Sequence, residues 1–301
     1  MITVRTADEL REKVLHARRS GLSIGLVPTM GALHDGHASL VEMSRGTCGF
    51  TITSIFINPT QFGPGEDLDR YPRTAAKDSQ MLENLGCDLL FMPDAADMYD
   101  GKGVTGITVS GLGEHLCGAS RPGHFEGVLL VVAKLLHMAS PDAAFFGQKD
   151  AQQAVMIQRM VADLDFPVRI RVGPIVREKD GLAMSSRNSY LSPEERKKAV
   201  AIHDGLREAF ERILAGERGS REIGRSMGAR MEQSGFAVDY AGVYCAAGLQ
   251  PVETLEGDVL LAAAGRMGKT RLIDNIALRI EGPEVRETIL EFPEWSRYGW
   301  K

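Results

Sequence analysis

Residues 23–45 open with Ser23-Ile-Gly-Leu-Val-Pro-Thr-Met30, continue with Gly31-Ala-Leu-His-Asp-Gly-His37 and end in a helical pattern over 38–45. The first run is apolar, which favours a buried strand. The strand therefore leads through a glycine turn into the start of a helix. Backbone N–H groups in the first turn of a helix are free and lie at the positive end of its dipole, so this junction suits a phosphate group.

The two histidines by themselves allow other interpretations. His34 and His37 share one helix face, but a pair with this spacing also occurs as helix caps, as surface side chains or as part of a metal site. A metal site needs further ligands, and no cluster of Cys or His lies nearby in the sequence. The four cysteines form no CxxC pair, which argues against zinc-ribbon and redox motifs and fits a reduced cytoplasm.

The chain around this junction alternates strands and helices through residue 175. Strand patterns occupy 50–57, 88–92, 143–146 and 168–172, and helical patterns occupy 6–19, 74–85, 127–138 and 152–163. This alternation is typical of a parallel sheet wrapped by helices, so residues 1–175 are expected to form an α/β domain with a Rossmann-like doubly wound parallel sheet. Ligands of such sheets bind at the carboxyl ends of the strands.

The pattern changes after residue 176. Ser192-Pro-Glu-Glu195 is a capping-box helix start. Helical patterns to 215 and over 220–234 come before three strand-like runs at 238–245, 259–263 and 271–278. Two helices followed by a small sheet predict a second, smaller α+β domain over 176–281. Residues 282–301 carry Trp295 and Trp300 and form a C-terminal extension to which the sequence assigns no role.

Composition narrows the class of protein. The chain has 301 residues, 35 Lys and Arg, 40 Asp and Glu, and a net charge of −5, which argues against a general nucleic-acid or membrane binder. The longest apolar run, 127–139, contains Lys134 and His137 and is shorter than the ~20 residues of a spanning helix. The first ten residues do not resemble a signal peptide. We therefore expect a cytoplasmic protein without nucleic-acid or membrane partners.

One further segment has a sequence similar to that of a phosphate-binding loop. Ala263-Ala-Ala-Gly-Arg-Met-Gly-Lys-Thr270 matches a relaxed version of that pattern and follows a strand. A phosphate loop must open a long helix, whereas residues 271–278 are short and β-like. We therefore expect a strand, a turn and a second strand here.

A second polar loop stands far from the histidines, at Met184-Ser-Ser-Arg-Asn188. Its two hydroxyls and one guanidinium can chelate a polyphosphate, although taken alone it is a generic polar loop. Together with the histidine motif, it resembles the nucleotidylyltransferase and class I aminoacyl-tRNA synthetase superfamily, whose histidines contact ATP phosphates. Its members include nucleotidylyltransferases, which transfer AMP to a phosphate, and this activity remains an alternative. A catalytically silent nucleotide or RNA binder is a second alternative.

Six segments of the chain resemble motifs of the pantothenate synthetase family and occur in the same order as in that family. They are residues 27–37, 54–62, 71–74, 120–125, 146–153 and 181–188. The family condenses pantoate with β-alanine using ATP and Mg²⁺, through an enzyme-bound pantoyl adenylate, and releases AMP and pyrophosphate. The resemblance also implies a homodimer whose partners are these small substrates. It assigns no protein ligand to the magnesium.

The resemblance implies roles for individual side chains. His37 is expected to be the principal catalytic imidazole, together with His34, Lys149 and Arg187. Gln61 and Gln153 match the family's pantoate-binding positions, and Asn58, Tyr71 and Arg121 lie inside matched segments. The residues expected to bind ATP are Met30, Gly31, Ala32, Leu33, His34, Asp35, Gly36, His37, Gly147, Gln148, Lys149, Asp150, Val176, Met184, Ser185, Ser186 and Arg187.

This chain departs from the family pattern in two places. Gln148 stands where the family commonly has Glu, so a carboxylate beside Lys149 is missing. The chain also continues past the usual family end near residue 282. The sequence explains neither difference.

Overall fold

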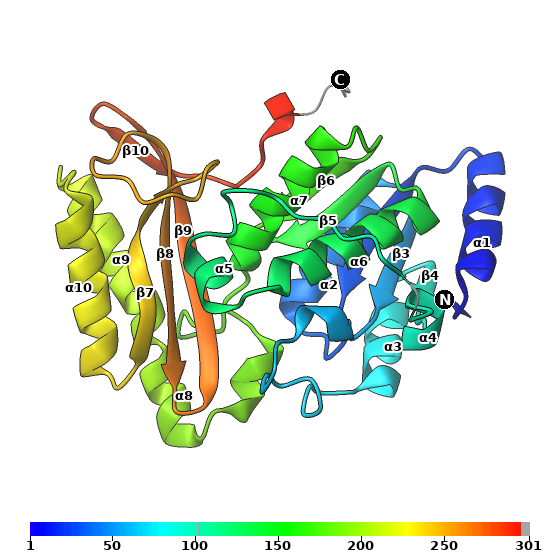
Figure 1. The fold of residues 1–301 in the computed structure, drawn as a ribbon, viewed down its shortest axis with the longest axis horizontal. Coiled ribbons are helices and arrows are strands. Elements are labelled where there is room, and N and C mark those ends of the chain that lie inside the picture. Colours follow the sequence, from blue (N-terminus) through cyan, green and yellow to red (C-terminus); the bar gives the residue numbers. More distant parts are fainter. Residues whose placement is uncertain (102, 296–301) are drawn as a thin grey trace.

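The computed structural model describes residues 1–101 and 103–295, which build a six-stranded and a four-stranded sheet with helices packed on both (Figure 1). The larger sheet is parallel in every pair and has the strand order β1-β4-β3-β2-β5-β6. Its strands are β1 (Ile2–Val4), β2 (Ile24–Thr29), β3 (Phe50–Ile55), β4 (Leu89–Phe91), β5 (Ala143–Gly147) and β6 (Arg169–Gly173). The predicted doubly wound sheet is thus confirmed, and β1 adds an edge strand that we did not predict.

Helices cover both faces of this sheet. One face carries α1 (Ala7–Arg19), α6 (His124–Ala139) and α7 (Ala151–Asp163). The other face carries α2 (Asp35–Thr47) and α3 (Ala75–Asn84). The short helices α4 (Ala95–Met98) and α5 (Leu116–Ser120) lie in the connection between β4 and α6. Among the described residues, no helix is both long and apolar enough to cross a bilayer.

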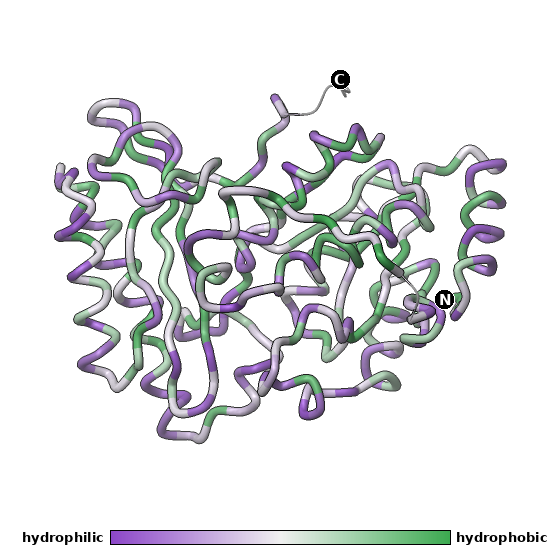
Figure 2. Tube along the Cα trace, in the orientation of Figure 1, coloured by the Kyte–Doolittle hydropathy of each residue, from purple (hydrophilic) through white to green (hydrophobic). Residues whose placement is uncertain are grey.

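The core of the large sheet follows from its continuous apolar strands. Leu26, Ile52 and Leu89 on three neighbouring strands are fully buried, and burying one such side chain stabilises the fold by roughly 1.5–3 kcal/mol. Figure 2 shows hydrophobic residues along these central strands, while hydrophilic residues recur along the outer helices such as α1. Strands that are apolar on both faces must be shielded from water on both sides, which is why helices cover both faces of this sheet.

The second half of the chain forms the predicted α+β unit. Its helices are α8 (Pro193–Ala199), α9 (Ala201–Leu214) and α10 (Ser220–Gln233), and its sheet is antiparallel in the order β10-β9-β8-β7. Its strands are β7 (Ala237–Cys245), β8 (Gly257–Met267), β9 (Thr270–Glu281) and β10 (Glu284–Glu287). The single helix expected from Ser192 to about residue 215 is in fact two helices, α8 and α9, that meet at Val200.

The segment 263–270, whose sequence is similar to that of a phosphate-binding loop, is part of a β-hairpin, as predicted. Met267 pairs with Thr270 across the two-residue turn Gly268-Lys269, and strand β9 follows this turn directly. Gly268 has a φ of +57°, a left-handed conformation that glycine adopts without strain.

The C-terminal extension, to which we assigned no role, is built into the structure as far as residue 295. It supplies β10 to the small sheet and ends in a single turn of 3₁₀-helix, η4 (Pro293–Trp295). Trp300 lies outside the described residues. The predicted domain limits stay a prediction, but β10 shows that the small sheet continues past residue 281.

Candidate active site

The strand order of the large sheet reverses between β2 and β5. From these two neighbours the chain proceeds in opposite directions, to β3 and β4 on one side and to β6 on the other. Loops that leave two such strands diverge and open a crevice at their carboxyl ends. The histidine segment follows β2 and the Gln148-Lys149-Asp150 turn follows β5, so the topology brings these two predicted segments together.

A buried carboxylate that we did not predict shapes the turn after β2. Asp78 on α3 is 1% exposed, and its two oxygens accept the backbone N–H groups of Ala32 and Leu33, each at 2.9 Å. Thr74 donates to the same carboxylate through its hydroxyl. Ala32 has a φ of +51°, a conformation that costs energy for a residue with a side chain. Asp78 therefore holds the turn that leads into His34.

The two histidines cap α2 and thereby orient each other. His34 Nδ1 accepts the backbone N–H of Gly36 at 3.2 Å, and His37 Nδ1 accepts the backbone N–H of His34 at 3.3 Å. A ring nitrogen that accepts a hydrogen bond carries no proton, so the neutral tautomer has its proton on Nε2 in both rings. The ring centroids lie 4.2 Å apart. The site thus offers two paired Nε2–H donors at a helix N-terminus.

Both imidazoles are held neutral. Burial, with a smaller contribution from the Lys149 ammonium, lowers the pKa of His34 to about 4. Burial and the neighbouring His34 lower the pKa of His37 to about 3. At neutral pH both side chains can donate a hydrogen bond without carrying charge. An anion bound between them would favour their protonation.

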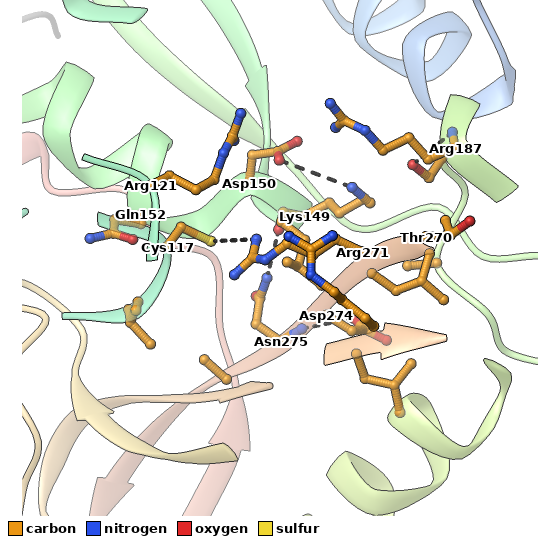
Figure 3. A pocket seen from close by; sticks show the side chains of 18 of the residues that line it. Cys117, Arg121, Lys149, Asp150, Gln152, Arg187, Thr270, Arg271, Asp274 and Asn275 are labelled. Atoms are coloured by element: carbon orange, nitrogen blue, oxygen red, sulfur yellow. Dashed lines mark hydrogen bonds and ion pairs between the residues drawn. The ribbon is translucent and has the colours of Figure 1, made fainter. Parts of the chain in front are cut away.

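A cavity of about 210 Å³ connects the two segments. It is joined to a larger cavity of about 480 Å³ between the two sheets (Figure 3), because Lys149, Asp150, Gln153 and Arg187 line both. Ligand sites typically have about 300–1,000 Å³, so the combined space suits a nucleotide and a small acid. The predicted residues that line the smaller cavity are Met30, His34, Gly36, His37, Asn58, Gln61, Tyr71, Arg121, Gly147, Lys149, Asp150, Gln153, Val176, Met184, Ser185, Ser186 and Arg187.

Five predicted ATP-binding residues do not line either cavity: Gly31, Ala32, Leu33, Asp35 and Gln148. The N–H groups of Gly31, Ala32 and Leu33 are already bonded to Thr29 and Asp78, so they are not available to a phosphate. Asp35 is exposed. The carboxamide oxygen of Gln148 accepts the backbone N–H of Leu290 at 3.2 Å, so this side chain serves the C-terminal extension instead of the cavity.

Gln61 is held by a buried polar network. Asn58, 1% exposed, donates to Gln61 Oε1 at 3.1 Å and to the Gly127 carbonyl at 3.1 Å. Gln61 Nε2 is left facing Met30 Sδ at 3.0 Å. A Cβ on Gly127 would lie 2.3 Å from the Thr60 carbonyl, so only glycine lets α6 approach this loop. Asn58 is therefore a support for Gln61, and Gln61 is left with its amide donors for a ligand.

His124 supports the same loop from the other side, although the sequence assigned it no role. Its Nδ1 donates to the Gln61 carbonyl at 2.8 Å, and its Nε2 accepts from Arg121 at 2.9 Å. Burial and the Arg121 charge lower the pKa of His124 to about 4. Arg121 also makes two bonds to Glu66, at 2.6 and 2.7 Å. The Arg121 guanidinium is therefore largely neutralised before any ligand binds.

The floor of the smaller cavity is apolar. One face of α6 contributes Val128, Val131, Val132 and Leu135. Phe56, just after β3, and Phe146, near the end of β5, complete it. We did not predict this surface as part of the site, because apolar residues at helical spacing are more often core residues. A branched aliphatic ligand would remove this surface from water.

The predicted serine–arginine loop reaches the site from the junction between the two halves of the chain. Ser186 Oγ lies 3.1 Å from the Tyr71 hydroxyl, and Ser185 Oγ accepts the Arg187 N–H. The Arg187 guanidinium makes a two-pronged pair with Asp67, at 2.8 and 2.9 Å. A phosphate must therefore share Arg187 with Asp67 or displace it, a competition that the sequence did not reveal.

The described part of the chain contains no group of three or more His, Cys, Asp or Glu side chains arranged to hold a metal ion. Near the cavities, the Asp150 carboxylate is about half exposed and lies 4.0 Å from Lys149 Nζ (Figure 3). Magnesium bound to a nucleotide often takes only one or two protein carboxylates. Asp150 is therefore a suitable single ligand.

Acid is expected to destabilise the fold between pH 6.5 and about 4. His34, His37 and His124 have folded-state pKa values of about 4, 3 and 4, whereas an unfolded histidine titrates near ~6.5. As the pH falls below 6.5, the unfolded chain takes up protons that the folded chain does not. Each histidine then lowers the free energy of unfolding by up to about 1.4 kcal/mol per pH unit.

Urea unfolding at pH 7 and pH 5 measures this effect. His124→Gln should reduce the pH dependence, and His16→Gln, at an exposed position on α1, is the control. Equal free energies of unfolding at the two pH values would contradict the assignment of His34, His37 and His124 as neutral buried side chains.

Comparison with known proteins identifies the family. The family model for pantoate-beta-alanine ligase matches residues 2–277. The pantothenate synthetase of Pseudomonas entomophila is 50% identical over 283 residues, which cover 93% of this chain and 99% of that protein. The crystal structure of pantothenate synthetase from Thermus thermophilus has a TM-score of 0.86 and 43% identity, and the match covers 91% of this chain and 98% of that one.

A second crystal structure extends the comparison to a liganded protein. It is the pantoate-beta-alanine ligase of Francisella tularensis complexed with beta-gamma ATP and beta-alanine, with a TM-score of 0.75 and 33% identity. That match covers 94% of this chain and 100% of the other. The sequence match, the shared fold and the assembled histidine site agree, and the chain belongs to the pantoate-beta-alanine ligase family.

Proposed function

We propose that this protein joins pantoate to β-alanine at the expense of ATP, through a pantoyl adenylate, and releases AMP and pyrophosphate. One observation carries the proposal: two neutral imidazole donors, an ammonium group and a serine–arginine loop surround one cavity that also contains two glutamines and an apolar floor. These are the groups that a phosphorylated nucleotide and a branched hydroxy acid require.

In the first step, the pantoate carboxylate attacks the α-phosphorus of ATP and pyrophosphate leaves. Negative charge then grows on the α-phosphate and on the leaving oxygens, and donors placed there in advance lower the barrier. His37 and His34 donate from Nε2 at the N-terminus of α2. Lys149, Ser185, Ser186 and Arg187, which line the same cavity, hold the phosphates.

Pantoate binds where the polar and apolar parts of the cavity meet. Gln61 presents its amide N–H groups, because its oxygen is occupied by Asn58. Gln153 lines both cavities and has an amide that can donate to a carboxylate and accept from a hydroxyl. The apolar face of α6 receives the branched carbon body. Neutral amides orient the carboxylate without the strong ion pair that would reduce its nucleophilicity.

The ATP-bound magnesium is expected to use Asp150. When bound, the ion supplies positive charge on the phosphate oxygens, which assists departure of pyrophosphate. Asp150 and Lys149 are adjacent, so one short turn presents a carboxylate to the cation and an ammonium to the phosphates.

In the second step, the amine of β-alanine attacks the acyl carbon of the adenylate, and AMP leaves. Holding both reactants in one cavity supplies much of the rate advantage. Walls that exclude water also protect the adenylate from hydrolysis. The larger cavity between the two sheets provides space for β-alanine beside the adenylate.

A product assay tests the whole proposal. ATP, magnesium and pantoate are supplied with and without β-alanine, and AMP and pyrophosphate are measured over time. Pantoate alone should give a burst of pyrophosphate no larger than the enzyme concentration, and β-alanine should start steady turnover to AMP. Turnover that β-alanine does not accelerate would contradict the ligase assignment.

We also propose that the protein is a cytoplasmic homodimer that acts on these small molecules. The family resemblance supports this proposal. Sedimentation equilibrium measures the molar mass directly. A monomer at all concentrations would rule out the dimer.

A further inference from the structure

The C-terminal extension crosses from the small sheet to the large one. After β10 pairs with β9, the chain runs over the surface toward α7 and β6 (Figure 1). We call residues 288–295 the strap. The family model ends at residue 277, so the strap lies beyond the matched region.

The strap is tied to the large sheet's domain by hydrogen bonds to its backbone. Gln158 on α7 donates to the Leu290 carbonyl at 2.8 Å and accepts the Phe292 N–H at 2.9 Å. Gln148 accepts the Leu290 N–H at 3.2 Å. Gln148 and Gln158 are each 6% exposed, so these bonds are made out of contact with water, where an unmade bond is costly.

The strap also fills the apolar seam between the two sheets. Leu290 is 2% exposed and Phe292 is 9% exposed. They share one cluster with Val155 of α7 and with Leu260 and Ala277 of the small sheet. The strap is therefore packed against both halves of the chain.

A separate bond fixes the strap to the edge of the large sheet. Glu291 accepts the backbone N–H of Val172 at 2.7 Å and pairs with Arg171 at 3.1 Å. This contact lies on β6 and does not involve the turn that carries Lys149. The strap is therefore anchored to the large sheet's domain at two separate places, on α7 and on β6.

The turn that carries Lys149 depends on partners from outside its own segment. It is a single 3₁₀ turn, η2 (Gln148–Asp150), with no side-chain cap. Asn275 on β9 donates from Nδ2 to the carbonyls of Gln148, at 2.9 Å, and Lys149, at 3.1 Å (Figure 3). The strap holds the Gln148 side chain. Asn275 thus holds the backbone of Lys149 directly, and the strap holds the side chain of the residue that precedes Lys149.

From these contacts we infer that the strap positions Lys149 for the phosphates of ATP. It acts through Gln148, whose side chain it fixes, and Gln158, which holds the strap itself. The inference rests on the proposed function of Lys149 as a phosphate ligand. It also accounts for Gln148 in place of the family's Glu, because a neutral amide accepts the Leu290 N–H without burying a charge.

Two variants test the inference: a chain truncated after Glu287, and Gln158→Leu in the full chain. In the truncated chain the KM for ATP should rise about 5- to 20-fold, with the KM for β-alanine unchanged. Gln158→Leu should give a smaller rise in the same parameter. Glu291→Ala, which removes the tie of the strap to β6, should also give a smaller rise than truncation. Gln80→Leu, at an exposed position on α3, is the control and should leave the KM for ATP within twofold of the wild type.

A double variant separates positioning from general stability. If the strap acts through Lys149, truncation in a Lys149→Ala background should change the KM for ATP by less than twofold. An additive effect in the double variant would overturn the inference. So would an equal rise in the KM for ATP with Gln80→Leu, or a folded truncated chain with the wild-type KM. If the truncated chain does not fold, the Gln158→Leu variant decides the question, and a wild-type KM for ATP in that variant would overturn the inference.

Hydrogen exchange tests the role of the strap independently of the proposed function of Lys149. Loss of the strap should speed exchange of the amides in 148–151 whether or not Lys149 binds ATP. Lys149→Ala with wild-type adenylation would refute the role of Lys149, whereas unchanged exchange in the truncated chain would refute the strap.

Discussion

Replacing His37 with alanine is expected to slow formation of pantoyl adenylate by at least ~100-fold. The variant removes the Nε2–H donor that the capping geometry directs away from its own helix. In the protein without a bound anion the His37 imidazole is neutral at pH 7, and with either protonation state its loss removes the Nε2–H donor to the transition state. Pyrophosphate release in a single turnover, with enzyme in excess over ATP, measures this step directly.

The control for His37→Ala is His16→Ala, at an exposed position in the last turn of α1. Circular dichroism checks that α2 still forms, because His37 also accepts the His34 N–H. A folded His37→Ala variant that releases pyrophosphate at the wild-type rate would remove His37 from the mechanism.

Replacing Asp78 with alanine is expected to lower the free energy of unfolding by about 2–4 kcal/mol and to reduce the adenylation rate as well. The change leaves the N–H groups of Ala32 and Leu33 without an acceptor at a site where Asp78 is 1% exposed. An unsatisfied buried donor costs about 1–3 kcal/mol. The released turn also carries His34, so the pair of imidazoles loses its fixed geometry.

Urea unfolding and single-turnover pyrophosphate release measure the two effects of Asp78→Ala. Asp78→Asn keeps one oxygen acceptor. Its free energy of unfolding and its rate of pyrophosphate release should therefore lie between those of the wild type and Asp78→Ala. Asp8→Ala removes an exposed ion pair on α1 and should change stability by less than about 1 kcal/mol. Wild-type stability in Asp78→Ala would show that the turn does not depend on this carboxylate.

Most of the fold was predictable because its signals are local. The apolar run before Gly31, the capping residue Thr6 and the Ser192-Pro193 start each specify an element through neighbours in the sequence. The hairpin at Gly268-Lys269 was predictable for the same reason, since the residues after it are β-like and short. The break at Val200 was missed, because the residues on both sides of it are good helix formers.

The site was only partly predictable. His34, His37, Lys149 and the serine–arginine loop line the cavities, as the resemblance implied. The apolar floor on α6 was missed, because the same residues fit an ordinary core. Asp67, which pairs with Arg187, was missed because an aspartate in a polar loop carries no signal of a partner 120 positions away.

The sequence by itself determined the strand–turn–helix at the histidines, the parallel sheet and the chemistry available after β2 and β5. Tertiary structure alone decided which polar groups meet. Asp78 bonds to Ala32 across 46 positions, Asn275 to Lys149 across 126, and Leu290 to Gln148 across 142. The reason is physical: a helix or a strand is specified by residues a few positions apart, whereas a buried donor finds its acceptor only once the topology has brought distant segments together.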